Sequence, residues 1–135
     1  MIDVTVLHEG DAEGPLLVLD EPLSFWGGFD PQTGRVIDQH HPQAGSLASG
    51  TVLALPETRG SAGTPAGVAE AIRKGCGPVA IITAKKDVNL VAGVMTARQL
   101  YDICVPVIEI AHKDLDKLTT GQTARLSGGH LIILP

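Results

Sequence analysis

The sequence has little cysteine. Cys76 and Cys104 are the only thiols among 135 residues, and no Cys-x-x-Cys pair is present. Two isolated cysteines are too few to ligate an iron–sulfur cluster, and they lack the paired spacing of zinc and thiol-redox sites. We therefore predict that this chain binds no metal by itself and that both cysteines are small buried hydrophobic residues.

Basic charge and long apolar runs are also scarce. Ten Lys and Arg oppose 15 Asp and Glu, for a net charge of −5, so we expect no nucleic-acid partner. No apolar run approaches the roughly 20 residues of a membrane helix, and the acidic start of the chain has no secretory-signal pattern. We expect a single domain over residues 1–135, with no membrane association and a cytoplasmic location.

Aromatic residues make up only 3% of the chain, and three of the four lie within five positions: Phe25, Trp26 and Phe29. Two adjacent glycines, Gly27 and Gly28, and a following Asp-Pro-x-x-Gly turn predict an irregular loop over 25–34. Aromatic side chains usually fill a core, but tryptophan is also enriched at protein interfaces. We favour contact with a partner over a core role.

Alternating strands and helices are predicted over the rest of the chain. Apolar runs predict strands at 15–19, 51–55, 79–83, 105–110 and 130–134, with a brief strand at 36–38. Thr64 is a suitable N-cap and Pro65 a suitable first residue for a helix that ends before Gly75. A second helix is expected at 92–103, a turn at 10–14 and a helical turn at 115–118. This order predicts an α/β fold with a parallel core.

The loop at 59–64, Arg-Gly-Ser-Ala-Gly-Thr, lies between a strand and a helix. Unpaired N–H groups and the dipole at a helix start favour a carboxylate or a phosphate. Arg59 adds a forked donor, and Gly60 and Gly63 allow the backbone to approach a ligand. Ser61 is either a turn residue or a hydroxyl that the surrounding donors could stabilise as an alkoxide.

An ordered series of motifs surrounds this loop. It comprises Glu-Pro-Leu-Ser-Phe-Trp-Gly-Gly-Phe-Asp-Pro-Gln-Thr-Gly at 21–34, Asp38, His41-Pro42, the apolar run at 52–56, Arg-Gly-Ser at 59–61, and the segments 70–75 and 77–82. This series, which covers most of the chain, closely resembles the small, swivelling subunit of aconitase X. The resemblance implies a swivelling β/β/α domain of the aconitase superfamily with a partly parallel central sheet.

The resemblance also implies a hydro-lyase that is active only with a large subunit, whose cysteines hold an iron or iron–sulfur centre. Ser61 matches the family's catalytic serine, a proton acceptor, and a small anionic substrate is expected. The positions expected to bind it are Arg59, Gly60, Gly63 and Thr64. The expected partner interface comprises Phe25, Trp26, Gly27, Gly28 and His41. Thr58 and Ala62 depart from the family pattern, which has a small residue before Arg-Gly-Ser and a hydroxyl residue after it.

Several alternatives remain open. Family members imply cis-3-hydroxy-L-proline as the substrate, which we favour, or mevalonate 5-phosphate. A non-catalytic module that binds an anion at the same loop is a competing hypothesis. His41 either reaches the active site or caps local backbone groups. His130 follows a glycine pair as in phosphocarrier domains, but at the wrong spacing, so we predict a strand histidine.

Overall fold

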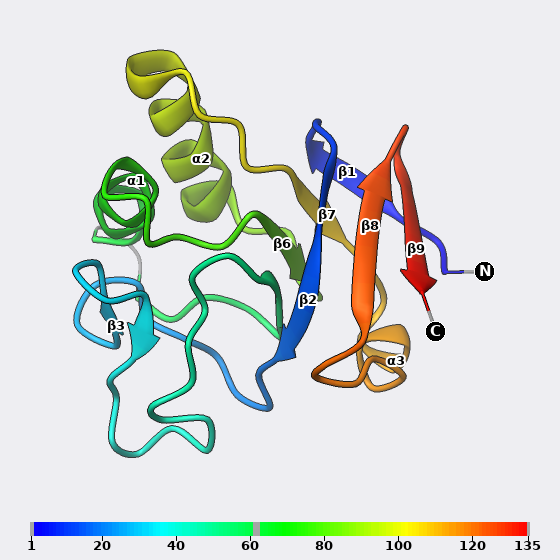
Figure 1. The fold of residues 1–135 in the computed structure, drawn as a ribbon, viewed down its shortest axis with the longest axis horizontal. Coiled ribbons are helices and arrows are strands. Elements are labelled where there is room, and N and C mark those ends of the chain that lie inside the picture. The colour runs from blue at the N-terminus through cyan, green and yellow to red at the C-terminus, as the bar shows by residue number, and fades with distance from the viewer. Residues whose placement is uncertain (1, 61–62, 135) are drawn as a thin grey trace.

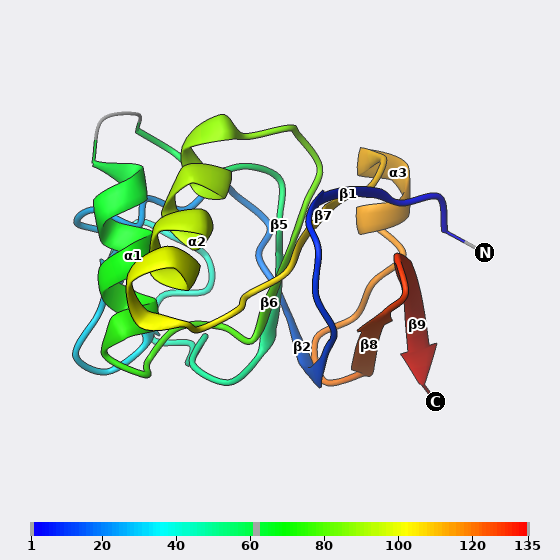
Figure 2. The ribbon, with the colours of Figure 1, turned by 90° about the horizontal axis from the view of Figure 1, so that it is seen from above.

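The computed structural model describes residues 2–60 and 63–134. A curled, partly parallel sheet separates two layers (Figures 1 and 2). Helices α1 (Thr64–Arg73) and α2 (Val88–Tyr101) cover one face. The short helix α3 (His112–Leu115) lies on the other side. The outer strands of the same sheet curl toward α3: β1 (Thr5–His8) and the hairpin of β8 (Thr123–Ser127) and β9 (His130–Leu134).

The middle of the sheet is parallel. Strands β2 (Ala12–Val18), β5 (Val52–Leu55), β6 (Ala80–Thr83) and β7 (Val107–Glu109) run in one direction and pair in that order. The outer strands β1, β8 and β9 pair antiparallel, and the sheet order in the described part is β1-β7-β6-β5-β2-β8-β9. The predicted α/β class and parallel core are confirmed.

The two central strands are buried on both faces. Leu53 and Ile81 face the helices, whereas Val52 and Ile82 belong to the core on the other side of the sheet. A parallel strand covered on both faces is expected to be a continuous apolar run, as β5 and β6 are. On the helix side the core extends beyond the sheet to Phe29, the first residue of the small hairpin of β3 (Phe29–Asp30) and β4 (Arg35–Val36).

Several predicted boundaries were wrong. Helix α2 begins at Val88 rather than 92, the strand expected at 105–110 is limited to Val107–Glu109, and β2 begins within the turn expected at 10–14. Thr64 is the first residue of α1 and Gly63 is its N-cap. The stretch predicted to lack regular structure contains β3.

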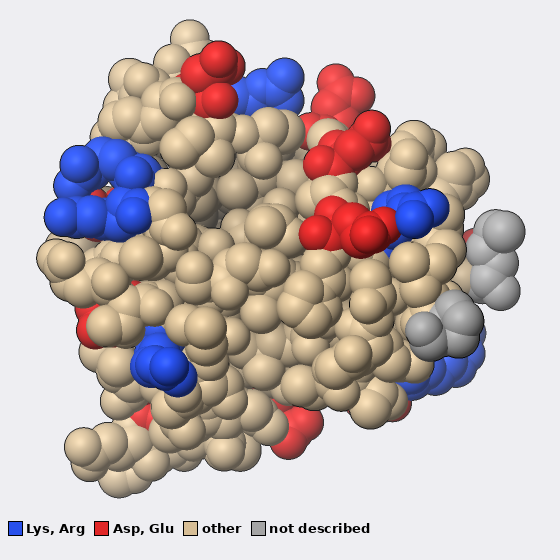
Figure 3. Space-filling view, viewed as in Figure 1, with Lys and Arg blue, Asp and Glu red and all other residues tan. Residues whose placement is uncertain are grey.

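Charged side chains are scattered over the face in Figure 3, where most of the surface is formed by other residues. Within residues 2–60 and 63–134, no helix has the length and apolar character required to cross a membrane. His130 begins β9, opposite Ser127, so the prediction of a strand histidine is confirmed.

Candidate functional site

Backbone hydrogen bonds hold the segment that connects β5 to the loop. After Pro56, the Arg59 N–H donates to the Leu23 carbonyl at 2.8 Å, and the Leu23 N–H donates to the Glu57 carbonyl at 3.3 Å. Thr58 and Leu23 thus form an isolated parallel bridge. This isolated pairing joins the segment after β2 to the segment after β5, at the position where the Arg-Gly-Ser segment begins.

Thr58 also connects this segment to helix α2. Its side chain is 9% exposed, and its hydroxyl donates to Oδ2 of Asp87. Asp87 is the N-cap of α2, and its Oδ1 accepts the N–H groups of Asn89 and Leu90, each at 3.0 Å. One carboxylate therefore caps a helix and holds the residue that precedes Arg59.

Arg59 lies at the surface, with 55% of its side chain exposed, and its Nη1 is 4.0 Å from Oδ2 of Asp38. Asp38 is held in a turn because its Oδ1 accepts the His40 N–H at 3.0 Å. An exposed ion pair of this length contributes little to stability. The guanidinium is therefore accessible to a stronger anionic partner.

His41, which follows this turn, is held by hydrogen bonds between its ring and the backbone. Its side chain is 5% exposed, its Nδ1 accepts the Gln43 N–H at 3.0 Å, and its Nε2 lies 3.1 Å from the Glu21 carbonyl oxygen. Since Nδ1 is the acceptor, Nε2 carries the hydrogen and donates it to Glu21. The alternative in which His41 caps local backbone is confirmed, and its burial contradicts our prediction of partner contact by this side chain.

The far end of the loop leads directly into α1. Gly60 has a φ of +88°, in the left-handed region that glycine tolerates. Thr64 is 1% exposed, and its hydroxyl lies 3.4 Å from the Gly60 carbonyl oxygen. The Thr64 side chain therefore bonds back to the start of the loop, and the role of Thr64 in substrate binding stays a prediction.

The start of α1 suits an anion. No acidic residue lies in the first turn of this helix, and the first amides of a helix have no partner within it. Pro65 contributes no N–H, so the backbone donors must come from its neighbours. Ser61, the predicted proton acceptor, and Ala62 lie outside the described residues.

Trp26 lies against the end of the loop. Its side chain is 68% exposed, and it packs on Gly63. The Ser24 hydroxyl fixes this turn, because it donates to the Trp26 carbonyl at 2.7 Å and accepts the Trp26 N–H at 3.2 Å. An exposed tryptophan beside an anion-binding loop is a suitable anchor for a partner.

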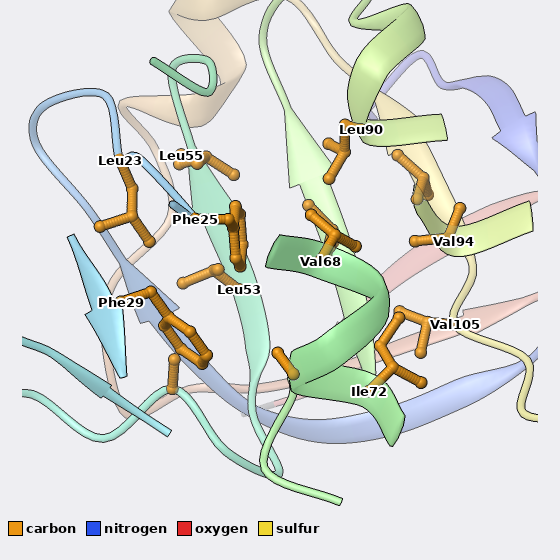
Figure 4. Packing of buried hydrophobic residues seen from close by; sticks show 14 of the residues in the cluster. Leu23, Phe25, Phe29, Leu53, Leu55, Val68, Ile72, Leu90, Val94 and Val105 are labelled. Atoms are coloured by element: carbon orange, nitrogen blue, oxygen red, sulfur yellow. The ribbon is translucent and has the colours of Figure 1, made fainter. Parts of the chain in front are cut away.

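Phe25 and Phe29 have a different role. They are 3% and 2% exposed, with ring centroids 5.3 Å apart, and they belong to the same buried cluster as Leu23, Leu53 and Val68 (Figure 4). This burial corrects the predicted interface role of Phe25 and the surface role favoured for Phe29. Both side chains therefore belong to the core on the helix side of the sheet.

The cysteines also differ from expectation. Cys104 is exposed and Cys76 partly exposed, so neither is a buried core residue. Cys104 lines a hollow of about 510 Å³ with Arg98 and His130, away from the loop residues. In the part of the chain that the structure describes, no three His, Cys, Asp or Glu side chains are grouped to hold a metal, so the described residues do not fit an iron centre.

Comparison with known proteins identifies the family. The model of the aconitase X swivel domain matches residues 1–134, so the chain belongs to the aconitase X swivel-domain family. The fold agrees: the crystal structure of holo-form aconitase X from Thermococcus kodakaraensis superposes with a TM-score of 0.87 and 29% identity. That superposition covers 99% of this chain and 98% of the other.

The curated relatives are named dehydratases. Cis-3-hydroxy-L-proline dehydratase of Hypocrea jecorina is 37% identical over 93% of this chain, which spans about a fifth (21%) of that protein's length. The phosphomevalonate dehydratase small subunit of Methanothermobacter thermautotrophicus is 36% identical over 84% of this chain and 82% of its own length. The resemblance noted from the sequence is confirmed.

Sequence reasoning assigned no contact at the entry to the loop to three residues that make one: Asp38, Thr58 and Asp87. A signal existed for Asp87, because an aspartate before a helix is a common N-cap. The contact of Thr58 with Asp87 joins residues 29 positions apart, and that of Asp38 with Arg59 joins residues 21 positions apart. No local pattern predicts such pairs.

Proposed function

We propose that this chain is the small, swivelling subunit of an aconitase X type hydro-lyase that removes water from cis-3-hydroxy-L-proline. The observation that carries the proposal is the identity of 37% with cis-3-hydroxy-L-proline dehydratase across 93% of the chain. The geometry supports it, because a glycine-containing loop with an exposed arginine precedes a helix whose first turn has no acidic residue.

In this mechanism Ser61 accepts the proton from the carbon next to the substrate carboxylate. An alcohol is a weak base and its alkoxide needs stabilisation, which nearby N–H donors and Arg59 would provide. The backbone at Gly60 and Gly63 and the guanidinium of Arg59 would hold the carboxylate. The described residues thus contribute binding and orientation, and Ser61 contributes proton transfer.

The reaction requires a large subunit. The described residues offer no metal cluster, and the iron or iron–sulfur centre is assigned to the partner. We place the partner contact at Trp26 with Gly27 and Gly28, because Trp26 is exposed beside the loop. Docking of the two chains would enclose the loop and exclude water from the substrate.

One observation favours a second substrate. Relatives of similar length to this chain are phosphomevalonate dehydratase small subunits, as in Methanothermobacter thermautotrophicus and Pyrococcus furiosus. Mevalonate 5-phosphate carries a phosphate as well as a carboxylate, and a helix N-terminus beside an arginine suits either group.

Reconstitution tests the proposal. The chain is combined with its large subunit, and each compound is assayed for loss of water. Turnover of cis-3-hydroxy-L-proline supports the primary assignment, and turnover of mevalonate 5-phosphate alone replaces it with the second. If the assembled pair dehydrates neither compound, both substrate assignments fail and a non-catalytic anion-binding module becomes the better explanation.

A further inference from the structure

Two elements that are distant in sequence meet at the entry to the loop. Thr58 lies one residue before Arg59 and three before Ser61, and its hydroxyl bonds to the carboxylate of Asp87, 29 residues further on. Leu23, which pairs with Thr58, and Leu90 in the first turn of α2 are both buried in the core on the helix side of the sheet (Figure 4).

Helix α2 is a fixed support for this contact. Its inner residues Leu90 and Val94 are fully buried, and Gly93 packs on Val68 and the Pro65 carbonyl oxygen of α1. The position of Asp87 is further fixed by the two amides of α2 that its Oδ1 accepts. Its second oxygen accepts the Thr58 hydroxyl.

We infer that Asp87 is a positioning residue: through Thr58 it sets the direction in which the chain enters the Arg-Gly-Ser segment. The Leu23 backbone fixes the same segment from the other side. With both constraints, Arg59 and Gly60 start from one orientation. The inference rests on the proposed function, because it concerns the placement of groups that this function uses.

Substitutions separate this role from helix capping. Thr58→Val removes the hydroxyl but keeps both the shape of the side chain and the cap of α2. Thr58→Ser restores the hydroxyl. Asp87→Ser keeps a good N-cap. Serine has a single side-chain oxygen on a shorter side chain, so it cannot cap α2 and accept the Thr58 hydroxyl together. Thr96→Val is the matched control, because the Thr96 hydroxyl also forms a hydrogen bond, at 2.8 Å to Ala92, on the exposed side of α2.

The first measurement is kcat and KM of each variant in the reconstituted enzyme. We expect Thr58→Val and Asp87→Ser to lower kcat about 10- to 100-fold, since misplacement by about 1 Å has effects of this order. Thr58→Ser should remain within about threefold of the wild type, and Thr96→Val should be indistinguishable from it. Wild-type kcat in Thr58→Val, or equal losses in Thr58→Ser and Thr58→Val, would overturn the inference.

The second measurement is independent of turnover. Amide hydrogen exchange of this chain alone should be at least about tenfold faster at Arg59 in Thr58→Val than in the wild type, with Ile81 in β6 unchanged. Unchanged exchange at Arg59 contradicts the positioning role even when the enzyme is active. If exchange increases as expected but the wild-type pair dehydrates neither substrate, the proposed function fails while the link between Asp87 and the loop stands.

Discussion

Gly63 and Trp26 are in direct contact: a Cβ atom on Gly63 would lie 2.7 Å from Cγ and 2.9 Å from Cβ of Trp26. The N-cap of α1 has a φ of −86° and a ψ of −15°, which any residue can adopt. Glycine is therefore required here by the close approach of the tryptophan and not by the backbone conformation. The contact joins the predicted partner surface to the end of the loop that is predicted to bind an anion.

The first prediction follows from this contact. Gly63→Ala should lower the free energy of unfolding by about 1 to 2 kcal/mol, as overpacking does. The two closest Trp26 atoms are at the base of its side chain, so they cannot move aside without a change of rotamer or backbone. Urea unfolding of the isolated chain measures the loss.

A double-mutant cycle is the control. In the Trp26→Ala background the collision is absent, and alanine loses less conformational entropy on folding than glycine, so Gly63→Ala should be neutral or stabilising by up to about 1 kcal/mol. Equal losses in both backgrounds would show that the contact with Trp26 is not the cause.

The second prediction concerns Ser61. If it is the proton acceptor, Ser61→Ala should lower kcat of the reconstituted enzyme about 10²- to 10⁴-fold while the affinity between the subunits is unchanged. Ser127→Ala, at the end of β8, is the control and should retain wild-type turnover. Wild-type turnover in Ser61→Ala would remove this hydroxyl from the mechanism.

The third prediction concerns subunit assembly. Trp26 is 68% exposed, so its truncation should leave the chain folded, yet it should raise the Kd for the large subunit about 30-fold or more if Trp26 is an interface hot spot. Isothermal titration calorimetry measures the Kd. Ile132→Ala is matched, because Ile132 is 41% exposed on β9, and a similar increase for both variants would argue against a specific role for Trp26.

The parts of the fold that follow from local pattern could be predicted. Strands β5 and β6 are short apolar runs bounded by turns, because parallel strands are buried on both faces. The start of α2 was misplaced although Asp87 offered an N-cap signal, since exposed apolar residues such as Val88 and Met95 obscure the helical period. Strand β1 was missed because half of its residues are exposed and it only extends the edge of the sheet.

The candidate site was predictable only in part. The strand, loop and helix that carry Arg59 and Gly63 follow from glycine, proline and apolar pattern. Composition could not reveal that Phe25 is buried while the adjacent Trp26 is exposed, because that difference depends on how the segment folds over α1. His41 likewise acquires its role from the Glu21 carbonyl, 20 residues away, through a contact that only the folded chain creates.

The fourth prediction concerns pH. Burial lowers the pKa of His8 from its ordinary value of 6.5, nearby Arg98 lowers it further, and Glu9 opposes the change. The His8 Nε2 atom is buried and has no hydrogen-bond partner among the described residues. The folded chain therefore binds a proton at this ring less readily than the unfolded chain.

The sign of the effect follows from this difference. Between the pKa of the folded state and 6.5, the unfolded state carries more protons, so the free energy of unfolding rises with pH. The stability contributed by neutral His8 is fully present above 6.5 and is lost as the pH falls through the folded-state pKa. Other groups titrate in the same range, so the comparison must be made with a variant. His8→Gln should lose less stability than the wild type between about pH 7.5 and about pH 5 in urea unfolding. His40→Gln, at an exposed position, should follow the wild type, and an unaltered pH dependence in His8→Gln would show that burial of this ring does not govern the acid sensitivity of the fold.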